Sequence, residues 1–230
     1  MLLKKKKISK KEIKHDALVD TYFSTRAWYS ENKKQVSTYG TIALVIVLGL
    51  WFYSNNVKSN NNEATTDLGK IYSFYDNGQF EIAKNGIPGQ NISGLESIVE
   101  NYGSTKSGNM AKLYLANIEL QSNNTDKAME LFEDFSSDDD LMNASAFAGI
   151  AACYEVKKEF ANSAKYFEKA ANSSTVDQSR AEYLSLAAQS FSQVGEKEKA
   201  KEIFKQIKSE YSSSNAARDA DRFISELSID

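Results

Sequence analysis

The sequence contains a single cysteine, Cys153, a single histidine, His15, and a single proline, Pro88. A single cysteine forms no intramolecular disulfide. Because His15 is far from Cys153 in the sequence and no other His or Cys is present, the C-terminal part contains neither a His/Cys catalytic pair nor a zinc site. Neither a nucleophile elbow nor a dinucleotide-binding glycine fingerprint is present. These absences argue against an enzyme, against a bound cofactor and against a small-molecule substrate.

Carboxylates are plentiful, but they are not arranged as a metal site. Residues 138–140 are three consecutive aspartates, and the further ligands and the glycine of a calcium loop are missing. Residues 58–230 carry 18 Lys or Arg and 27 Asp or Glu, a net charge of −9. Binding of nucleic acid requires a basic surface. The sequence therefore predicts a solvated acidic loop at 138–140, no metal and no nucleic-acid partner.

One uncharged run stands out near the N-terminus, at residues 36–57 (VSTYGTIALVIVLGLWFYSNNV). Roughly 18–20 helical residues, at about 1.5 Å each, span a hydrocarbon core about 30 Å thick. A buried core helix and a cleavable signal peptide are alternatives, but Trp51, Phe52 and Tyr53 stand where small residues would mark cleavage. The run favours an uncleaved signal anchor that crosses a membrane. Its membrane residues are Tyr39, Ile42, Leu44, Val45, Ile46, Val47, Leu48, Leu50, Trp51, Phe52 and Tyr53.

Charge asymmetry predicts the orientation of this anchor. Residues 1–35 hold ten Lys or Arg and four Asp or Glu, a net charge of +6, and basic residues are retained on the cytoplasmic side. Residues 1–35 are therefore expected in the cytoplasm and residues 58–230 outside it, after a flexible linker at 58–63. Residues 10–35 fit an amphipathic helix whose stripe lies in the membrane interface, docks on a partner, or simply orients and anchors the chain. That stripe consists of Ile13, Ala17, Leu18, Tyr22 and Phe23.

From residue 64 onward the pattern is helical, since no stretch alternates with the two-residue period of strands. It also repeats with a period near 35 residues. In each copy a turn is followed by a small residue and then, four positions later, by phenylalanine: Ala128 and Phe132, Ser163 and Phe167, Ala200 and Phe204. A pair of neighbouring residues recurs in the helix before each turn: Leu115-Ala116, Ile150-Ala151 and Ala187-Ala188. Small residues let antiparallel helices approach closely, and such hairpins bury their apolar faces only by stacking.

This pattern resembles the tetratricopeptide repeat (TPR) family. The resemblance implies an all-α solenoid of helical hairpins, with repeats at 109–142, 144–177 and 181–214. A degenerate earlier unit is expected at 64–103, with a surface loop around 86–89, and a capping helix at 215–228. The chain departs from the family pattern at Glu119, where an aromatic residue is expected, at Ser163, which replaces alanine, and in lacking the closing prolines.

The order of segments also resembles a narrower group, the YfgM-like TPR proteins, which are ancillary subunits of the bacterial SecYEG translocon. The resemblance rests on Phe23 and the stretch WYSENKK at 28–34 running into the anchor, then a polar linker and the repeats. The basic N-terminus is longer here, and the Gly-Pro-Gly insert is distinctive. The resemblance implies a single-pass protein of the bacterial inner membrane with a periplasmic TPR domain. Its implied partners are SecYEG, periplasmic chaperones or exported clients.

In TPR stacks the first helix of each pair lines the concave face. By repeat position this predicts a groove that is apolar and aromatic near the anchor and polar farther along, where a partner segment would bind. Alternatively, Leu68, Tyr72 and Leu113 pack against the neighbouring helix or the 84–93 insert. No pattern of Lys and Asn that would clamp a C-terminal carboxylate is present. The predicted groove residues are Leu68, Tyr72, Tyr75, Met110, Leu113, Asn117, Leu120, Glu155 and Gln189.

Two non-enzymatic functions follow from the sequence. The first is a membrane-anchored TPR adaptor that binds partner proteins outside the cytoplasm, as an accessory subunit of the Sec translocon assisting export or chaperone handover. The second is a structural scaffold of another envelope complex, such as outer-membrane assembly or cell division. Crosslinking from the anchor distinguishes the two.

Overall fold

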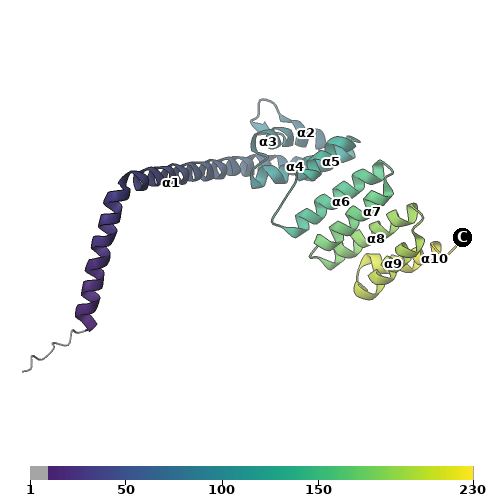
Figure 1. The fold of residues 1–230 in the computed structure, drawn as a ribbon. Helices are drawn as coiled ribbons and strands as arrows, with labels where there is room; N and C mark the ends of the chain where they lie inside the picture. The colour runs from purple at the N-terminus through teal and green to yellow at the C-terminus, as the bar shows by residue number, and fades with distance from the viewer. Residues whose placement is uncertain (1–9, 230) are drawn as a thin grey trace, which may run out of the picture. The chain divides into compact units, whose positions relative to one another are not determined.

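The computed structural model describes the backbone of residues 10–229 and the side chains from Ala17 to Ile229. Within this part of the chain there are ten helices and one short two-stranded sheet, which confirms the predicted all-α class (Figure 1). The chain divides into two compact units, residues 1–56 and residues 57–230. Residues 1–9 and the side chains of Ile13 and His15 lie outside the described residues.

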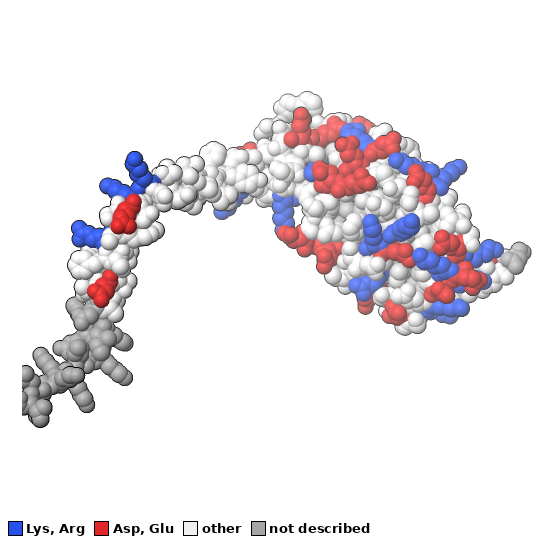
Figure 2. Space-filling model, in the orientation of Figure 1, with Lys and Arg blue, Asp and Glu red and all other residues white. Residues whose placement is uncertain are grey.

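Residues 10–56 of helix α1 (Lys10–Asp76) form the described part of the first unit, and the remainder of α1 belongs to the second. The apolar run is not buried against any other described part of the chain, so Leu44 is 58% exposed and Trp51 is 67% exposed. Figure 2 shows the run as a white band without charged side chains. A helix that is apolar around its whole circumference needs an apolar surrounding. This stretch is long and apolar enough to cross a membrane and is compatible with a single-pass anchor.

The expectation of a flexible linker at 58–63 is wrong, because these residues are helical and belong to α1. No glycine or proline interrupts residues 51–68, so nothing in the backbone ends the helix there. Polar contacts within the second unit also hold this segment in place. The backbone N–H of Ser107 donates to Asn61 Oδ1 over 2.9 Å, and the Tyr102 hydroxyl donates to Glu63 Oε2 over 3.0 Å.

The rest of the second unit is dominated by helix pairs that follow one another along the stack (Figure 1). The turn inside each pair contains a residue with positive φ: Asn123 at 61°, Lys158 at 60° and Gly195 at 82°. A residue in the left-handed conformation at this place ends the first helix of the pair, because the backbone N–H groups of the turn then bond to the last carbonyls of that helix. The pairs are α4 (Lys106–Gln121) with α5 (Thr125–Glu133), α6 (Asp140–Val156) with α7 (Phe160–Ser173), and α8 (Asp177–Gln193) with α9 (Lys197–Glu210).

The recurring small and aromatic residues form the core of this stack. Ala128, Ser163 and Ala200 are fully buried, and the three phenylalanines that follow them are no more than 3% exposed. The helices approach so closely that a Cβ added at Gly149 of α6 would lie 2.4 Å from the Phe132 ring of α5. Cys153 is buried in the same part of the core. Small residues at the helix crossings are thus what allow the pairs to stack.

The unit before α4 is built from the end of α1, α2 (Phe80–Asn85), β1 (Gly86–Ile87), β2 (Ile92–Ser93) and α3 (Leu95–Tyr102). The insert expected as a surface loop is a short antiparallel hairpin, in which Gly86 pairs with Ser93 and Ile87 with Ile92. Strands of two residues are too short to show alternation in the sequence. A Cβ at Gly86 or Gly94 would lie 2.3 Å from neighbouring backbone atoms, so the hairpin requires glycine at both places.

Helix α10 (Asn215–Glu226) closes the described end of the stack. Ser214 is its N-cap, since its hydroxyl accepts a hydrogen bond from the backbone N–H of Ala217 over 3.1 Å. The Phe223 ring stacks on Phe204 of α9, with centroids 4.9 Å apart. Ile224 packs against the same core cluster. Helix α10 also carries exposed charged side chains, at Arg218, Asp219, Asp221 and Arg222.

Candidate functional site

An open groove of about 460 Å³ lies between the end of α1 and the start of α4, both within the second unit. Most of its wall is apolar or aromatic. Tyr72 is 42% exposed there, and Lys106 is the charged residue in the wall. The residues that line it are Thr65, Leu68, Gly69, Tyr72, Lys106, Ser107, Met110 and Tyr114. An open cavity with apolar walls and few polar groups suits an apolar segment of a ligand.

One wall of this groove is an aromatic cluster. The Tyr114 ring lies 5.4 Å from Tyr72 and 4.8 Å from Tyr75, and Tyr75 in turn lies 6.0 Å from Phe80. Burial raises the pKa of Tyr75, an effect that a hydrogen bond to Asn117 partly opposes, and burial raises the pKa of Tyr114 as well. Both phenols therefore stay neutral around pH 7. The cluster offers aromatic surface together with uncharged hydroxyls.

Among the residues predicted for the groove, Leu68, Tyr72 and Met110 line it, and Tyr75 and Asn117 adjoin it. Leu113 lies elsewhere. It is only 6% exposed and belongs to the core cluster that contains Phe132 and Cys153, and Leu120 packs against the same cluster. For Leu113 the packing alternative holds, and Leu120, which was predicted for the groove, packs against the core as well.

Tyr114, one position later, takes the place in the groove that the sequence reasoning gave to Leu113. The repeat register carries the signal that could have found it. Tyr114 precedes Leu115-Ala116 as Gly149 precedes Ile150-Ala151, and the structure shows Gly149 against the preceding pair at Phe132. A large residue at this register position therefore faces the previous helix pair.

The two remaining predicted residues lie farther along the stack, in polar surroundings. Glu155 is partly buried and accepts a hydrogen bond from the Ser190 hydroxyl over 3.1 Å. Burial raises the pKa of Glu155, and the Ser190 hydrogen bond opposes this in part. Gln189 donates to the backbone carbonyl of Ser185 over 3.3 Å and lines a small cavity of about 250 Å³ between α8 and α10. The wall near α8 is thus polar where the wall near α1 is apolar.

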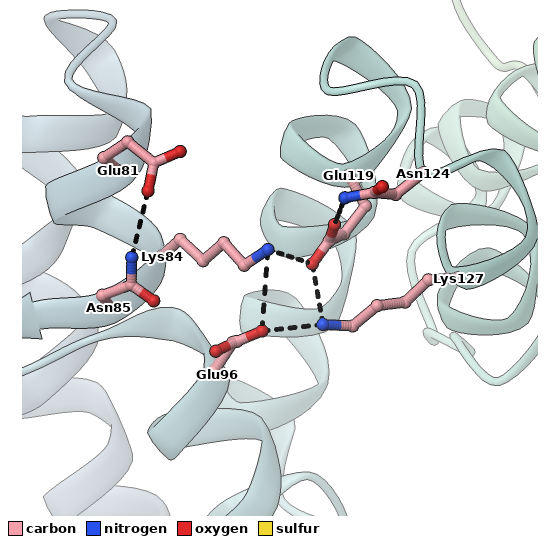
Figure 3. Close-up of polar contacts among 7 residues, drawn as sticks. All are labelled: Glu81, Lys84, Asn85, Glu96, Glu119, Asn124 and Lys127. Carbon is pink, nitrogen blue, oxygen red and sulfur yellow. Dashed lines mark hydrogen bonds and ion pairs between the residues drawn. The ribbon is translucent and has the colours of Figure 1, made fainter.

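A charged cluster joins α2, α3, α4 and α5 (Figure 3). Glu119 is fully buried, at the position where the TPR pattern has an aromatic residue. Its Oε1 lies 2.9 Å from Lys84 Nζ and 2.8 Å from Lys127 Nζ, and its Oε2 accepts a hydrogen bond from Asn124 over 2.7 Å. Lys127 also reaches Glu96 Oε1 at 2.7 Å.

The protonation state of Glu119 follows from these contacts. Burial alone would raise the pKa of Glu119, but the hydrogen bonds from Lys127, Lys84 and Asn124 together outweigh burial and lower the pKa from 4.5 to about 2. The hydrogen bond to Glu119 is the largest cause of a raised pKa at Lys127, and the hydrogen bond to Glu96 raises that pKa further. Glu119 and Lys127 are therefore both ionised at neutral pH. The cluster ties α2 and α3 to the first regular helix pair within the second unit.

The sequence model of the tetratricopeptide repeat-like domain family matches residues 26–174 of this chain. The chain belongs to the tetratricopeptide repeat-like family. A search of curated proteins found no match, and neither did a search of solved structures. Among the side chains from Ala17 to Ile229, no three His, Cys, Asp or Glu residues come together as a metal site.

Membership of the tetratricopeptide repeat-like family bears on function. Repeat domains of this kind are generally non-catalytic modules that bind other proteins. The matched residues include the apolar run, the groove and the first two helix pairs, while α8, α9 and α10 lie beyond the match. Those helices nevertheless keep the repeat residues, with Gly195 in the turn and Ala200 and Phe204 in the core.

Proposed function

We propose that this chain is a membrane-anchored TPR adaptor that binds partner proteins. The open apolar groove beside Tyr72 and Tyr114 carries the proposal, because an exposed aromatic surface of this kind is a place for another protein's apolar segment. The apolar run of α1 would span the bacterial inner membrane once. The basic residues 1–35 would lie in the cytoplasm and the TPR domain, residues 64–230, in the periplasm.

The finer proposal is an accessory role at the Sec translocon, in export or in handover to periplasmic chaperones. Two observations support it. The residues at 28–34 and the segment order resemble the YfgM-like group, and the family match begins at residue 26, so it takes in the whole stretch from Trp28 through the anchor to the repeats. The proposed repeats are 109–142, 144–177 and 181–214, after a degenerate unit at 64–103 and before a cap at 215–228.

Site-specific photo-crosslinking in a bacterial host tests both levels of the proposal. A photoreactive residue at Leu48 reports what touches the anchor, and one at Tyr72 reports what occupies the groove. We expect SecY adducts from Leu48 and adducts with a chaperone or an exported protein from Tyr72. Exclusive adducts with division or outer-membrane assembly components would replace the translocon role by that of a scaffold for another envelope complex.

A charge placed in the groove tests whether the groove is the binding surface. Tyr72→Glu introduces a carboxylate into an apolar wall, which should lower co-purification of the partner identified by crosslinking about tenfold. Lys165→Glu makes a charge change on the exposed surface of α7 and serves as the matched control. Unchanged recovery with Tyr72→Glu, in a protein whose buried Cys153 stays unreactive, would show that the partner binds elsewhere.

Protease added to intact spheroplasts tests the orientation. We expect digestion of the TPR domain and protection of residues 1–35. Cleavage of the N-terminal segment with a protected TPR domain would reverse the proposed topology and move the partners to the cytoplasm.

A further inference from the structure

The part of α1 that precedes the apolar run carries exposed apolar side chains of its own. Leu18 is 72% exposed, Tyr22 is 59% and Phe23 is 60%, and Trp28 and Tyr29 are also exposed. Tyr22 and Phe23 contact each other, edge to face at 5.5 Å. Large apolar groups gathered on one short segment without a covering element mark a surface that binds something.

Helical geometry places these side chains together with basic ones. At about 100° per residue, Leu18, Tyr22 and Tyr29 fall within about 40° of one another around the helix axis. Arg26 and Lys33 fall within about another 40° of that group. The face is therefore both aromatic and basic.

The acidic residues of the segment lie on the other side. By the same geometry Asp20 and Glu31 fall about 160–200° away from the centre of the aromatic group. Lys34 falls on this side too, so two of the three basic residues of the segment share the aromatic face and both acidic residues lie away from it. The two acidic and three basic side chains are all exposed.

An anionic lipid surface fits this combination better than a protein does. Protein interfaces are depleted of lysine at their centre, whereas aromatic rings and the long stems of Arg and Lys suit the boundary between acyl chains and headgroups. The segment is also continuous with the uncharged run, since Lys34 is followed closely by Tyr39. Its partner surface is therefore the leaflet that the anchor would enter.

We propose that residues 17–35 are a lipid-binding helix whose face of Leu18, Tyr22, Arg26, Tyr29 and Lys33 docks on anionic phospholipid headgroups. This proposal rests on the membrane anchor of the proposed function. It assigns to the segment before the anchor a ligand of its own, separate from the protein ligand of the groove.

The two tryptophans allow the anchor and the lipid-binding helix to be tested separately. The chain contains only Trp28 and Trp51, so Trp51→Phe leaves a reporter on the helix and Trp28→Phe leaves one at the end of the apolar run. The full chain would be reconstituted into phosphatidylcholine vesicles with or without phosphatidylglycerol. Lipids carrying a quencher near the headgroup then report contact of each tryptophan with the membrane surface.

We expect quenching of Trp51 in both kinds of vesicle and quenching of Trp28 that depends on phosphatidylglycerol. Each basic residue near an anionic surface changes the ratio of docked to undocked helix about fivefold. Arg26→Gln combined with Lys33→Gln should therefore lower the ratio of docked to undocked helix about 25-fold. The matched control, Lys165→Gln with Lys205→Gln, removes two exposed lysines from the TPR domain and should leave Trp28 quenching unchanged.

Three results would overturn one proposal or the other. If Trp51 is not quenched in either kind of vesicle, the membrane anchor itself fails. If Trp51 is quenched but Trp28 stays accessible to aqueous iodide in anionic vesicles, the lipid-binding helix fails and a protein ligand takes its place. Equal quenching of Trp28 with and without phosphatidylglycerol would show contact with lipid but no recognition of the anionic headgroup.

Discussion

Replacing Glu119 by glutamine removes the one buried charge that holds α2, α3, α4 and α5 together. The substitution keeps the size of the side chain, so any change in stability comes from electrostatics rather than packing. Lys84 and Lys127 would then face each other with only Glu96 between them, at 3.8 Å and 2.7 Å. Removing one partner of a buried pair leaves the other charges without compensation.

The pKa of Glu119 gives the size of the effect. A carboxylate whose pKa falls from 4.5 in the unfolded chain to about 2 in the folded one stabilises the fold by about 3 kcal/mol. Solvent screens part of this, because the Lys127 side chain is 46% exposed, so we expect a loss of about 2 kcal/mol at pH 7. Since the folded pKa is the lower one, the contribution is complete above about pH 5 and is lost as the pH falls toward 2.

Labelling of Cys153 measures this loss in the full chain in detergent micelles. Burial raises the pKa of the Cys153 thiol to about 11, so the folded protein reacts slowly with a thiol reagent and the unfolded chain reacts quickly. A urea series at pH 7 then gives the free energy of unfolding for Glu119→Gln and for the parent chain. Far-UV circular dichroism gives the same comparison at lower pH, where the free energies of unfolding of the two proteins should become equal.

The matched control is Glu198→Gln in α9. Glu198 also pairs with a lysine, Lys201 at 2.9 Å, but its side chain is 83% exposed, and exposed pairs of this kind contribute less than about 1 kcal/mol. If Glu119→Gln cost no more than Glu198→Gln, or if its effect did not fade at acidic pH, the charged cluster would not be what ties α2 and α3 to the regular helix pairs.

Two further predictions concern the backbone. Gly149→Ala should destabilise the domain by about 1–3 kcal/mol, because the new methyl group would meet the Phe132 ring. Gly69→Ala should instead stabilise α1 by about 0.5–1 kcal/mol, because no atom lies within 4 Å of the added Cβ. Equal urea midpoints for the two variants would contradict this prediction. Lys158→Gly should stabilise the domain by about 1 kcal/mol, because φ is 60° there, and Gly195→Ala should cost about as much in the same titration. A loss of stability in Lys158→Gly would show that the lysine side chain does more than occupy the turn.

The regular repeats could be predicted because their signal is short-range and recurs. The spacing of small residues and phenylalanines marks the helix crossings directly, and burial of Ala128 and Phe132 follows from that spacing. The prediction for residues 58–63 was wrong because their polar composition is typical of a linker. Their helical state depends on contacts of Asn61 and Glu63 with residues more than 35 positions away. Such long-range partners leave no local pattern.

The groove was predicted less well, for a reason of geometry. One residue along a helix is about 100° around its axis, so a shift of one position exchanges Leu113, in the core, for Tyr114, in the groove. Glu119 shows the converse case. Its departure from the aromatic pattern was visible in the sequence, but the role of the departure depends on Lys84 and Lys127, which come from separate helices.

Helix α10 has a consequence for the solubility of the whole stack. Without it, Phe204 and Ile207 of α9 would present a bare apolar face at this end of the stack, and such faces on two copies would pack against each other. Shortening the chain before Ser214 should therefore turn a dispersed protein into one that associates through this end as its concentration rises. Helix α10 thus covers the last core cluster and gives this end of the stack a charged, exposed surface.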